Sequence, residues 1–243
     1  MSSTIDPKEI EKFHAMADEW WDESGKFKPL HKFNPIRISY IRNKIVKHFS
    51  LDEKSATPFS GLKILDIGCG GGLISEPFAR MKADVTAIDA GEKNIAVAKI
   101  HAQKSDLKIN YRVATSEELA TKDEKYDVVF ALEIIEHVAD VENFVKSCAH
   151  LVKPNGIIFI STINRTLKAL ALAKFAAEYI LRWLPAGTHD WKKFLKPSEI
   201  NFYASQNSLE LQEMKGFSYN ILKDEWSESN DVDVNYVAVF CKK

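Results

Sequence analysis

Between residues 63 and 162, short apolar runs alternate with stretches of helical periodicity, and this alternation restricts the fold more than any other feature of the chain. The apolar runs have the length and composition of buried strands. A strand, a helix and a further strand in this order form a right-handed crossover between parallel strands, so the expected fold class is α/β. The expected strands are 63–67, 84–88, 109–113, 126–132 and 156–162, and the expected helices are 73–82, 92–104, 116–121 and 140–152.

Helical patterns also precede and follow this alternation. Asp6 is placed as an N-cap and Pro7 in the first turn of an amphipathic helix that is expected to run to Gly25. Asn34-Pro35 is expected to begin a second helix, which the polar segment 50–61 follows. A long apolar helix, residues 167–184, interrupts the alternation after the fifth strand. Beyond it we expect a helix at 197–206 and strands at 209–214 and 234–241, which bring the sheet to seven strands.

We interpret these segments as one domain with additions, because 243 residues lie near the upper limit for a single hydrophobic core. The helices in residues 1–50 would form a lid or a flank, and residues 61–162 the cofactor-binding core. Residues 163–196 would be an inserted amphipathic segment, and residues 197–243 the last helix and strands.

The charge and the cysteine content exclude several classes of protein. A net charge of -1 gives no general attraction to nucleic acid, so we expect no nucleic-acid partner. Cys69, Cys148 and Cys241 are too few and too scattered for a disulfide framework or a zinc site, which fits a reducing compartment. The first residues lack the pattern of a secretory signal, and no run of about 18 uncharged apolar residues occurs. We therefore expect a cytoplasmic protein, with membrane contact limited to the periphery.

The best-defined binding motif follows the first expected strand. Gly68, Gly70 and Gly72 form a G-x-G-x-G turn between a strand and a helix, where a ligand can approach backbone N–H groups at the positive end of the helix. A dinucleotide fingerprint would place its third small residue one position later, where Leu73 stands. Asp66 ends the strand, where a carboxylate repels a pyrophosphate but can order the loop or face an ammonium group. These features favour S-adenosylmethionine, which has an amino acid and no phosphate.

Acidic residues further along the chain extend the expected cofactor site. Asp89 ends the next strand, about 20 residues on, where a carboxylate can accept hydrogen bonds from both ribose hydroxyls. After the third strand, Ser116 or Glu117 can reach the adenine amino group. A Ser-x-x-Glu type of start is also an ordinary helix cap, so the residues leave this last assignment open.

These motifs resemble those of a known family. The segment from Asp66 to Gly72 and Asp89 are similar to motifs of class I S-adenosylmethionine-dependent methyltransferases, over about residues 60–162. Further segments resemble the ubiquinone-biosynthesis O-methyltransferases over nearly the whole chain. They are Phe27-Lys28-Pro29-Leu30-His31, Asn34-Pro35-Ile36-Arg37, Glu178-Tyr179-Ile180-Leu181-Arg182, Gly187-Thr188-His189-Asp190 and Asp233-Val234-Asn235-Tyr236. The implied fold is Rossmann-like, with a mostly parallel seven-stranded sheet, helices on both faces, an N-terminal helical lid and an inserted helix.

The resemblance implies a reaction, a substrate class and four contact residues. Members of this family methylate ring hydroxyls of polyprenylated catechol-type precursors of ubiquinone, using S-adenosylmethionine. By resemblance, Arg37, Gly68, Asp89 and Leu132 contact the cofactor. A guanidinium such as that of Arg37 can bind the methionine carboxylate through two parallel hydrogen bonds. The implied partners are a polyprenylated phenol or quinol substrate and other enzymes of ubiquinone biosynthesis.

The segment Glu133-Ile134-Ile135-Glu136-His137 follows the fourth strand, at the edge where open α/β sheets bind their ligands. If this segment is helical, Glu133, Glu136 and His137 share one face and can hold a divalent cation. Mg²⁺ is then favoured over Zn²⁺ because carboxylates dominate, and the ion would lower the pKa of the attacking hydroxyl. Without a cation, Glu133 and His137 remain catalytic candidates, and His189 is a competing general base. The residues leave both interpretations open.

The expected helix at 167–184 combines an apolar face with four charges, at Lys168, Lys174, Glu178 and Arg182. These charges forbid spanning a bilayer but permit a position at its surface. Lys192, Lys193 and Lys196 follow and can meet anionic headgroups. Because a polyprenyl tail resides in the bilayer, we predict peripheral contact with the inner face of the membrane. The alternative is that this face packs on the domain or on a second subunit.

Three other functions remain compatible with the residues. The first is an O- or N-methyltransferase of a soluble small molecule, which the apolar inserted helix disfavours. The second is an NAD-dependent oxidoreductase, which Leu73 and Asp66 disfavour. The third is a non-catalytic binding protein with the same fold, against which Glu133, Glu136 and His137 argue.

Overall fold

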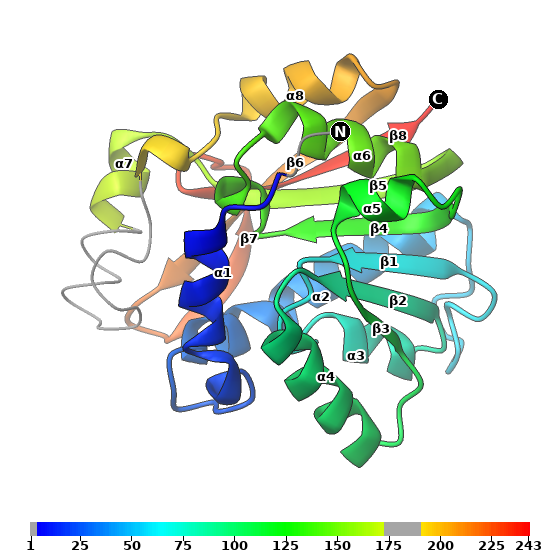
Figure 1. The fold of residues 1–243 in the computed structure, drawn as a ribbon. Coiled ribbons are helices and arrows are strands. Elements are labelled where there is room, and N and C mark those ends of the chain that lie inside the picture. The colour runs from blue at the N-terminus through cyan, green and yellow to red at the C-terminus, as the bar shows by residue number, and fades with distance from the viewer. Residues whose placement is uncertain (1–3, 173–190) are drawn as a thin grey trace.

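An eight-stranded sheet runs through the part of the chain that the computed structural model describes, residues 4–172 and 191–243 (Figure 1). Its strand order is β3-β2-β1-β4-β5-β8-β6-β7. The strands β1 to β5 are parallel, whereas β8 is antiparallel to both of its neighbours and β7 is antiparallel to β6. The expected mostly parallel α/β sheet is thereby confirmed. The strands are β1 Lys63–Ile67, β2 Asp84–Asp89, β3 Asn110–Val113, β4 Tyr126–Leu132, β5 Val152–Ile163, β6 Leu209–Asn220, β7 Glu225–Ser229 and β8 Asn235–Lys242.

Helices cover both faces of this sheet (Figure 1). Successive side chains of a strand point to opposite faces, so Ile64 packs with α2, α3 and α4, while Leu65 packs with α5, α6 and α8. Both side chains are fully buried. The helices are α1 Pro7–His14, α2 Lys28–His48, α3 Ser75–Arg80, α4 Glu92–Lys104, α5 Ser116–Ala120, α6 Val141–Leu151, α7 Leu167–Ala169 and α8 Pro197–Ser205, with 3-10 turns η1 Ala17–Glu19, η2 Ile135–His137 and η4 Trp191–Lys193.

The sheet has one strand more than the seven that we expected. β7 pairs with the end of β6 in a hairpin, with Asn220 opposite Glu225. Apart from Trp226, the residues of β7 are polar, and most are exposed because the strand forms an edge of the sheet. A search for apolar runs misses such a strand, and it also ends β6 too early.

The N-terminal helices differ from expectation in their bounds. α1 ends at His14 instead of continuing to Gly25, because the chain turns so that Trp20 stacks on Phe27 with ring centroids 3.8 Å apart. α2 begins at Lys28, before Asn34, and contains Pro35 within it. The start is placed by Pro29 in the first turn, where a missing N–H costs no hydrogen bond.

The structure describes the two ends of the inserted segment, residues 163–172 and 191–196. α7 starts where the long helix was expected, and Thr166 caps it by accepting a 3.0 Å hydrogen bond from the backbone N of Ala169. Residues 173–184 of the predicted helix, together with His189, lie outside the described residues. Among the helices that are described, none is long and apolar enough to cross a membrane. Contact with a membrane surface stays a prediction.

Candidate active site

A cavity of about 640 Å³ lies at the edge of the sheet where the parallel strands end. The ends of β1, β2 and β4 contribute to it, as do α1, α2 and the end of β6. Ligands of open α/β sheets bind at this edge. Among the predicted site residues, Arg37, Asp66, Gly68, Gly70, Asp89, Ser116, Leu132, Glu133 and His137 line the cavity, whereas Gly72 and Glu136 do not.

The glycine loop after β1 is bent so tightly that side chains are excluded from it. Gly68, Gly70 and Gly72 have positive φ values of 72°, 52° and 89°. A Cβ atom at Gly70 would lie 2.4 Å from the ring of Trp20, and one at Gly72 would lie 2.2 Å from the hydroxyl of Tyr111. Gly68 and Gly70 therefore present bare backbone to the cavity, while Gly72 lets the loop pack against the sheet.

Asp89 organises the cavity at the end of β2. Its carboxylate accepts hydrogen bonds from the backbone N of Gly70 at 3.0 Å and of Gly91 at 2.7 Å, and from the side chain of Asn94 at 3.1 Å. Asn94 in turn accepts a 2.9 Å hydrogen bond from the indole of Trp20. Burial raises the pKa of Asp89, against the lowering effect of these hydrogen bonds. One carboxylate thus connects the glycine loop, α4 and the N-terminal region.

Asp66 and Arg37 form a charged centre beneath the loop. Asp66 accepts a 2.5 Å hydrogen bond from Ser75, and burial raises its pKa to about 6. Arg37 comes from α2 and is 2% exposed. Its Nη1 lies 3.2 Å from Glu133, and its Nη2 donates to Asn34 at 2.6 Å. Its Nε has no hydrogen-bond partner among the residues that the structure describes. An unsatisfied buried donor of this kind costs about 1–3 kcal/mol, so the site is prepared for an acceptor.

The segment after β4 does not form the α-helix on which the expected metal site depends. Glu133 has a φ of 54° and turns the chain, so only the short 3-10 turn η2 follows. Glu133 accepts hydrogen bonds from Arg37 and Ser161 and faces the cavity. Glu136 turns inward, is 3% exposed and accepts a 2.9 Å hydrogen bond from Thr162. The expected shared face of Glu133, Glu136 and His137 is therefore wrong.

Burial and the charge of Glu133 raise the pKa of Glu136 to about 7. Within residues 4–172 and 191–243, no three His, Cys, Asp or Glu side chains are grouped so that they could hold a metal ion.

His137 lies at the cavity wall against α1. Its Nδ1 is 2.9 Å from Oε2 of Glu9, and its ring meets that of Phe13 edge-on at 5.2 Å. The hydrogen bond with His137 is the main cause that lowers the pKa of Glu9 to about 2. Lys193 binds the same carboxylate at 3.3 Å and Asp6 at 3.0 Å. The arrangement holds an imidazole in a fixed orientation beside the cavity, as a general base requires.

The far end of the cavity is closed by the first described residues. Ser116 and Glu117 are buried there at the start of α5, and the hydroxyl of Thr4 donates a hydrogen bond to Glu117. The backbone O of Thr4 accepts a 2.8 Å hydrogen bond from Ala139. Leu132, at the end of β4, lines the cavity and is 8% exposed. The side-chain neighbourhood of Ser116 is therefore compatible with the predicted adenine site.

Sequence reasoning missed the contribution of α1 and the residues after it. Glu9 and Trp20 were expected on a lid or flank, but they contact His137 and Asn94 directly. These pairs are separated by 128 and 74 positions in the chain. No spacing pattern in one sequence links residues so far apart.

The comparison with known families agrees with this geometry. Residues 65–160 match a family model described as a methyltransferase domain. The ubiquinone biosynthesis O-methyltransferase of Sinorhizobium medicae is 53% identical over 98% of this chain and 96% of that protein. The enzyme of the same name from Pelagibacter ubique is 53% identical over 99% of both chains. The resemblance inferred from the motifs is thereby confirmed.

Solved structures also share the fold. Magnesium protoporphyrin IX methyltransferase from Synechocystis PCC 6803, with bound SAH, superposes with a TM-score of 0.69 over 98% of this chain and 100% of that chain, at 18% identity. A protein from Pyrococcus horikoshii OT3 superposes with a TM-score of 0.63 over 96% of this chain and 99% of that chain, at 15% identity. At these identities the likeness concerns the fold alone.

Proposed function

Since this chain belongs to the ubiquinone-biosynthesis O-methyltransferase family, we propose that its cavity brings S-adenosylmethionine and a ring hydroxyl of a polyprenylated catechol-type precursor together for methyl transfer. The enzyme is an S-adenosylmethionine-dependent methyltransferase. The observation that carries the proposal is that Arg37, Asp89 and His137 surround one cavity at the strand ends. These three side chains supply a carboxylate ligand, a ribose ligand and a base.

The residues present fit the cofactor. The unpaired Nε of buried Arg37 is a donor for the methionine carboxylate, and Asp89 is an acceptor for the ribose hydroxyls. The carboxylates of Asp66, Glu133 and Glu136 all act on the charge of Arg37. This surplus of negative charge favours a ligand with ammonium and sulfonium groups.

When bound, S-adenosylmethionine supplies an electrophilic methyl group on its sulfonium, and transfer to oxygen requires no covalent bond to the enzyme. The protein must therefore position the hydroxyl and remove its proton. Glu9 holds Nδ1 of His137, and we propose that Nε2 of the ring takes the proton. The carboxylate of Glu9 then stabilises the imidazolium that forms. We assign the general base to His137, and Glu133 to holding Arg37 in place.

The predicted donors for a magnesium ion do not fit one in this arrangement. Glu133 is engaged by Arg37 and Ser161, Glu136 by Thr162, and His137 by Glu9. A magnesium titration after exhaustive chelation tests this: activity that stops and is restored by Mg²⁺ would require Glu133 to leave Arg37.

A polyprenylated substrate resides in a bilayer, so we extend the proposal to peripheral contact with the inner face of the membrane. Leu167 and Leu172 at the start of the inserted segment are 78% and 48% exposed, beside Lys168. Cosedimentation with anionic liposomes that falls with added salt would support this contact. Association with other enzymes of the pathway stays a prediction.

Mass spectrometry of the product tests the proposed function. We expect wild-type protein with S-adenosylmethionine to add one methyl group to a prenylated catechol. The matched control is the same compound with both hydroxyls already methylated, which has no attacking oxygen. Binding of adenosylhomocysteine without methylation of any catechol would support a non-catalytic binding protein. Methylation of soluble amines or phenols alone would support the other methyltransferase function.

A further inference from the structure

The cavity extends well beyond the cofactor residues, along the same edge of the sheet toward β6 and β7. Because β6 is antiparallel to β8, which is antiparallel to β5, the end of β6 lies at the same edge as the ends of the parallel strands. We call this extension the distal arm. It is lined by Phe33, Phe217, Tyr219, Trp226, Ile221 and Leu172.

The inner walls of the distal arm are aromatic. Phe33 of α2 lies 5.2 Å from Phe217 and 4.8 Å from Trp226, measured between ring centroids. Trp226 lies 5.3 Å from Tyr219 in the same way. Arg37 stacks over Phe33 at 4.8 Å, so the aromatic walls begin directly beside the charged centre. An apolar substituent of a ligand bound beside Arg37 would therefore meet aromatic walls.

Within the part of the chain that the structure describes, the outer end of the distal arm opens between α7 and the β6–β7 hairpin. Ile221 and Leu172 line the cavity, yet they are 69% and 48% exposed. Leu222, the next residue of the hairpin, is 97% exposed and does not line the cavity. Apolar side chains at the mouth of a cavity mark a surface that an apolar ligand covers.

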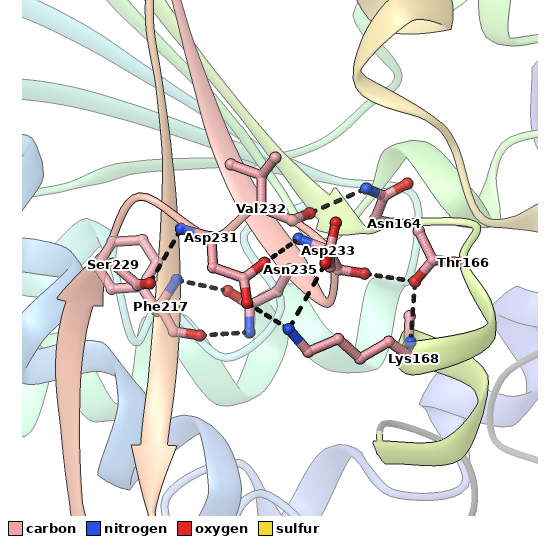
Figure 2. A network of polar contacts seen from close by, with 10 residues as sticks. Asn164, Thr166, Lys168, Phe217, Ser229, Asp231, Val232, Asp233 and Asn235 are labelled. Carbon is pink, nitrogen blue, oxygen red and sulfur yellow. Dashed lines mark hydrogen bonds and ion pairs between the residues drawn. The ribbon is translucent and has the colours of Figure 1, made fainter.

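A network of polar contacts holds the two sides of this opening together, and Figure 2 shows how Lys168 of α7 reaches toward Asp231 and Asp233. Thr166 donates a 2.5 Å hydrogen bond to the backbone O of Asp233. Asn235 bonds to both backbone groups of Phe217, at 3.0 Å and 3.1 Å. These contacts link α7 to residues 231–233, which precede β8, and β8 in turn to β6. The opening is part of the folded structure and not a gap between loosely connected segments.

We propose that the distal arm binds the first isoprenoid units of the substrate, and that the tail leaves the protein between Leu172 and Ile221. This inference rests on the proposed function, because it takes the ring to be methylated beside His137. Isoprenoid units are branched, uncharged and unsaturated, and so they suit aromatic walls next to aliphatic ones. Lys168 at the mouth is paired with Asp231 and Asp233, so its charge is not left facing the tail unpaired.

Steady-state kinetics without lipid, on a catechol with and without a short isoprenoid tail, test this inference. Ile221→Asp places a charge against the tail, so we expect the ratio of KM for the tailed to KM for the untailed catechol to rise about tenfold or more. Leu222→Asp is the matched control, because it makes the same change at the neighbouring exposed position outside the cavity. Its ratio should equal that of the wild type. Leu172→Asp should repeat the effect from the opposite side.

The outcomes separate this inference from the proposed function. Failure of the wild type to methylate either catechol overturns the proposed function. A wild type that methylates both catechols with equal KM overturns only the distal arm, as does an equal ratio in Ile221→Asp, Leu172→Asp and the wild type. Circular dichroism of each variant checks its fold. If Ile221→Asp alone were misfolded, Leu172→Asp would decide the result.

Discussion

The two halves of the cavity are built from the chain in different ways. The half around the cofactor residues takes its loop, Asp89 and Ser116 from consecutive strand ends, β1 to β3, and uses backbone N–H groups as much as side chains. The distal arm collects side chains from α2, β6, β7, the turn between β6 and β7, and Leu172 after α7, which are far apart in sequence. A constant polar cofactor can be held by a local motif. A long apolar substituent needs a surface assembled by the tertiary fold.

The largest effect should come from the proposed general base. We expect His137→Ala to lower kcat by about 10² to 10⁴, because removing a general base costs this much. Affinity for adenosylhomocysteine should change little, since the contacts of Asp89 and Arg37 remain. Rapid-quench kinetics and calorimetry measure the two quantities. A normal kcat would show that His137 is not the general base, and His189 would be the next candidate.

Glu9→Gln should act in the same direction as His137→Ala but to a smaller extent. The amide keeps a hydrogen bond to Nδ1 but no longer stabilises a charged ring. We expect kcat to fall while KM for the catechol is retained. A fall in thermal stability with kcat unchanged would reduce Glu9 to a structural contact between α1 and the rest of the chain.

The second largest effect should be confined to the cofactor half. Asp89→Ala should weaken binding of S-adenosylmethionine by about 1–3 kcal/mol, because the ribose hydroxyls lose a charged acceptor and the loop loses its bond to Gly70. Asp84→Ala, an exposed position at the start of the same strand, is the control. Calorimetry measures both. Equal affinity in the two folded variants would contradict the ribose assignment.

This division also explains how much could be predicted from the sequence. α4 was placed at its observed bounds, 92–104, because its periodicity and the strands around it agree. The glycine turn and the position of Asp89 at a strand end could be predicted because both depend on local spacing. The predicted helical face of Glu133 and Glu136 does not form, because Glu133 has a positive φ where the chain turns after β4. The end of the strand sets this conformation, and the conformational preference of glutamate does not indicate it. The contact of Glu9 with His137 depends on how α1 packs on the finished fold.

The buried carboxyl group of Glu136 permits a further test. Its pKa is raised from 4.5 to about 7 in the folded state, so folding takes up a proton and wild-type stability falls as pH rises through this window. Glu136→Gln does not titrate. The free energy of unfolding of the variant relative to the wild type should therefore rise between about pH 4.5 and 7. Urea denaturation at several pH values measures it, and a difference independent of pH would contradict the buried carboxylate.

The smallest effects should come from two threonines that cap helices at opposite ends of the cavity. Thr115 caps α5 in the cofactor half, and Thr166 caps α7 at the distal arm. Replacing either by Ala removes one capping bond, so we expect each to lower the free energy of unfolding by about 1 kcal/mol. Their functional effects should differ. Thr166→Ala also breaks the bond to Asp233 that frames the opening, and so it should raise KM for the tailed catechol.

Thr115 lies beside Ser116 at the cavity, so Thr115→Ala should instead weaken cofactor binding. Denaturation curves, calorimetry and KM for the tailed catechol, measured on both variants, separate stability from function. If the two substitutions changed cofactor affinity and KM in the same proportion, the halves of the cavity would be coupled through the sheet. The two variants could instead lose equal stability, while Thr115→Ala changed only cofactor affinity and Thr166→Ala changed only KM for the tailed catechol. Each end of the cavity would then be held by its own helix cap.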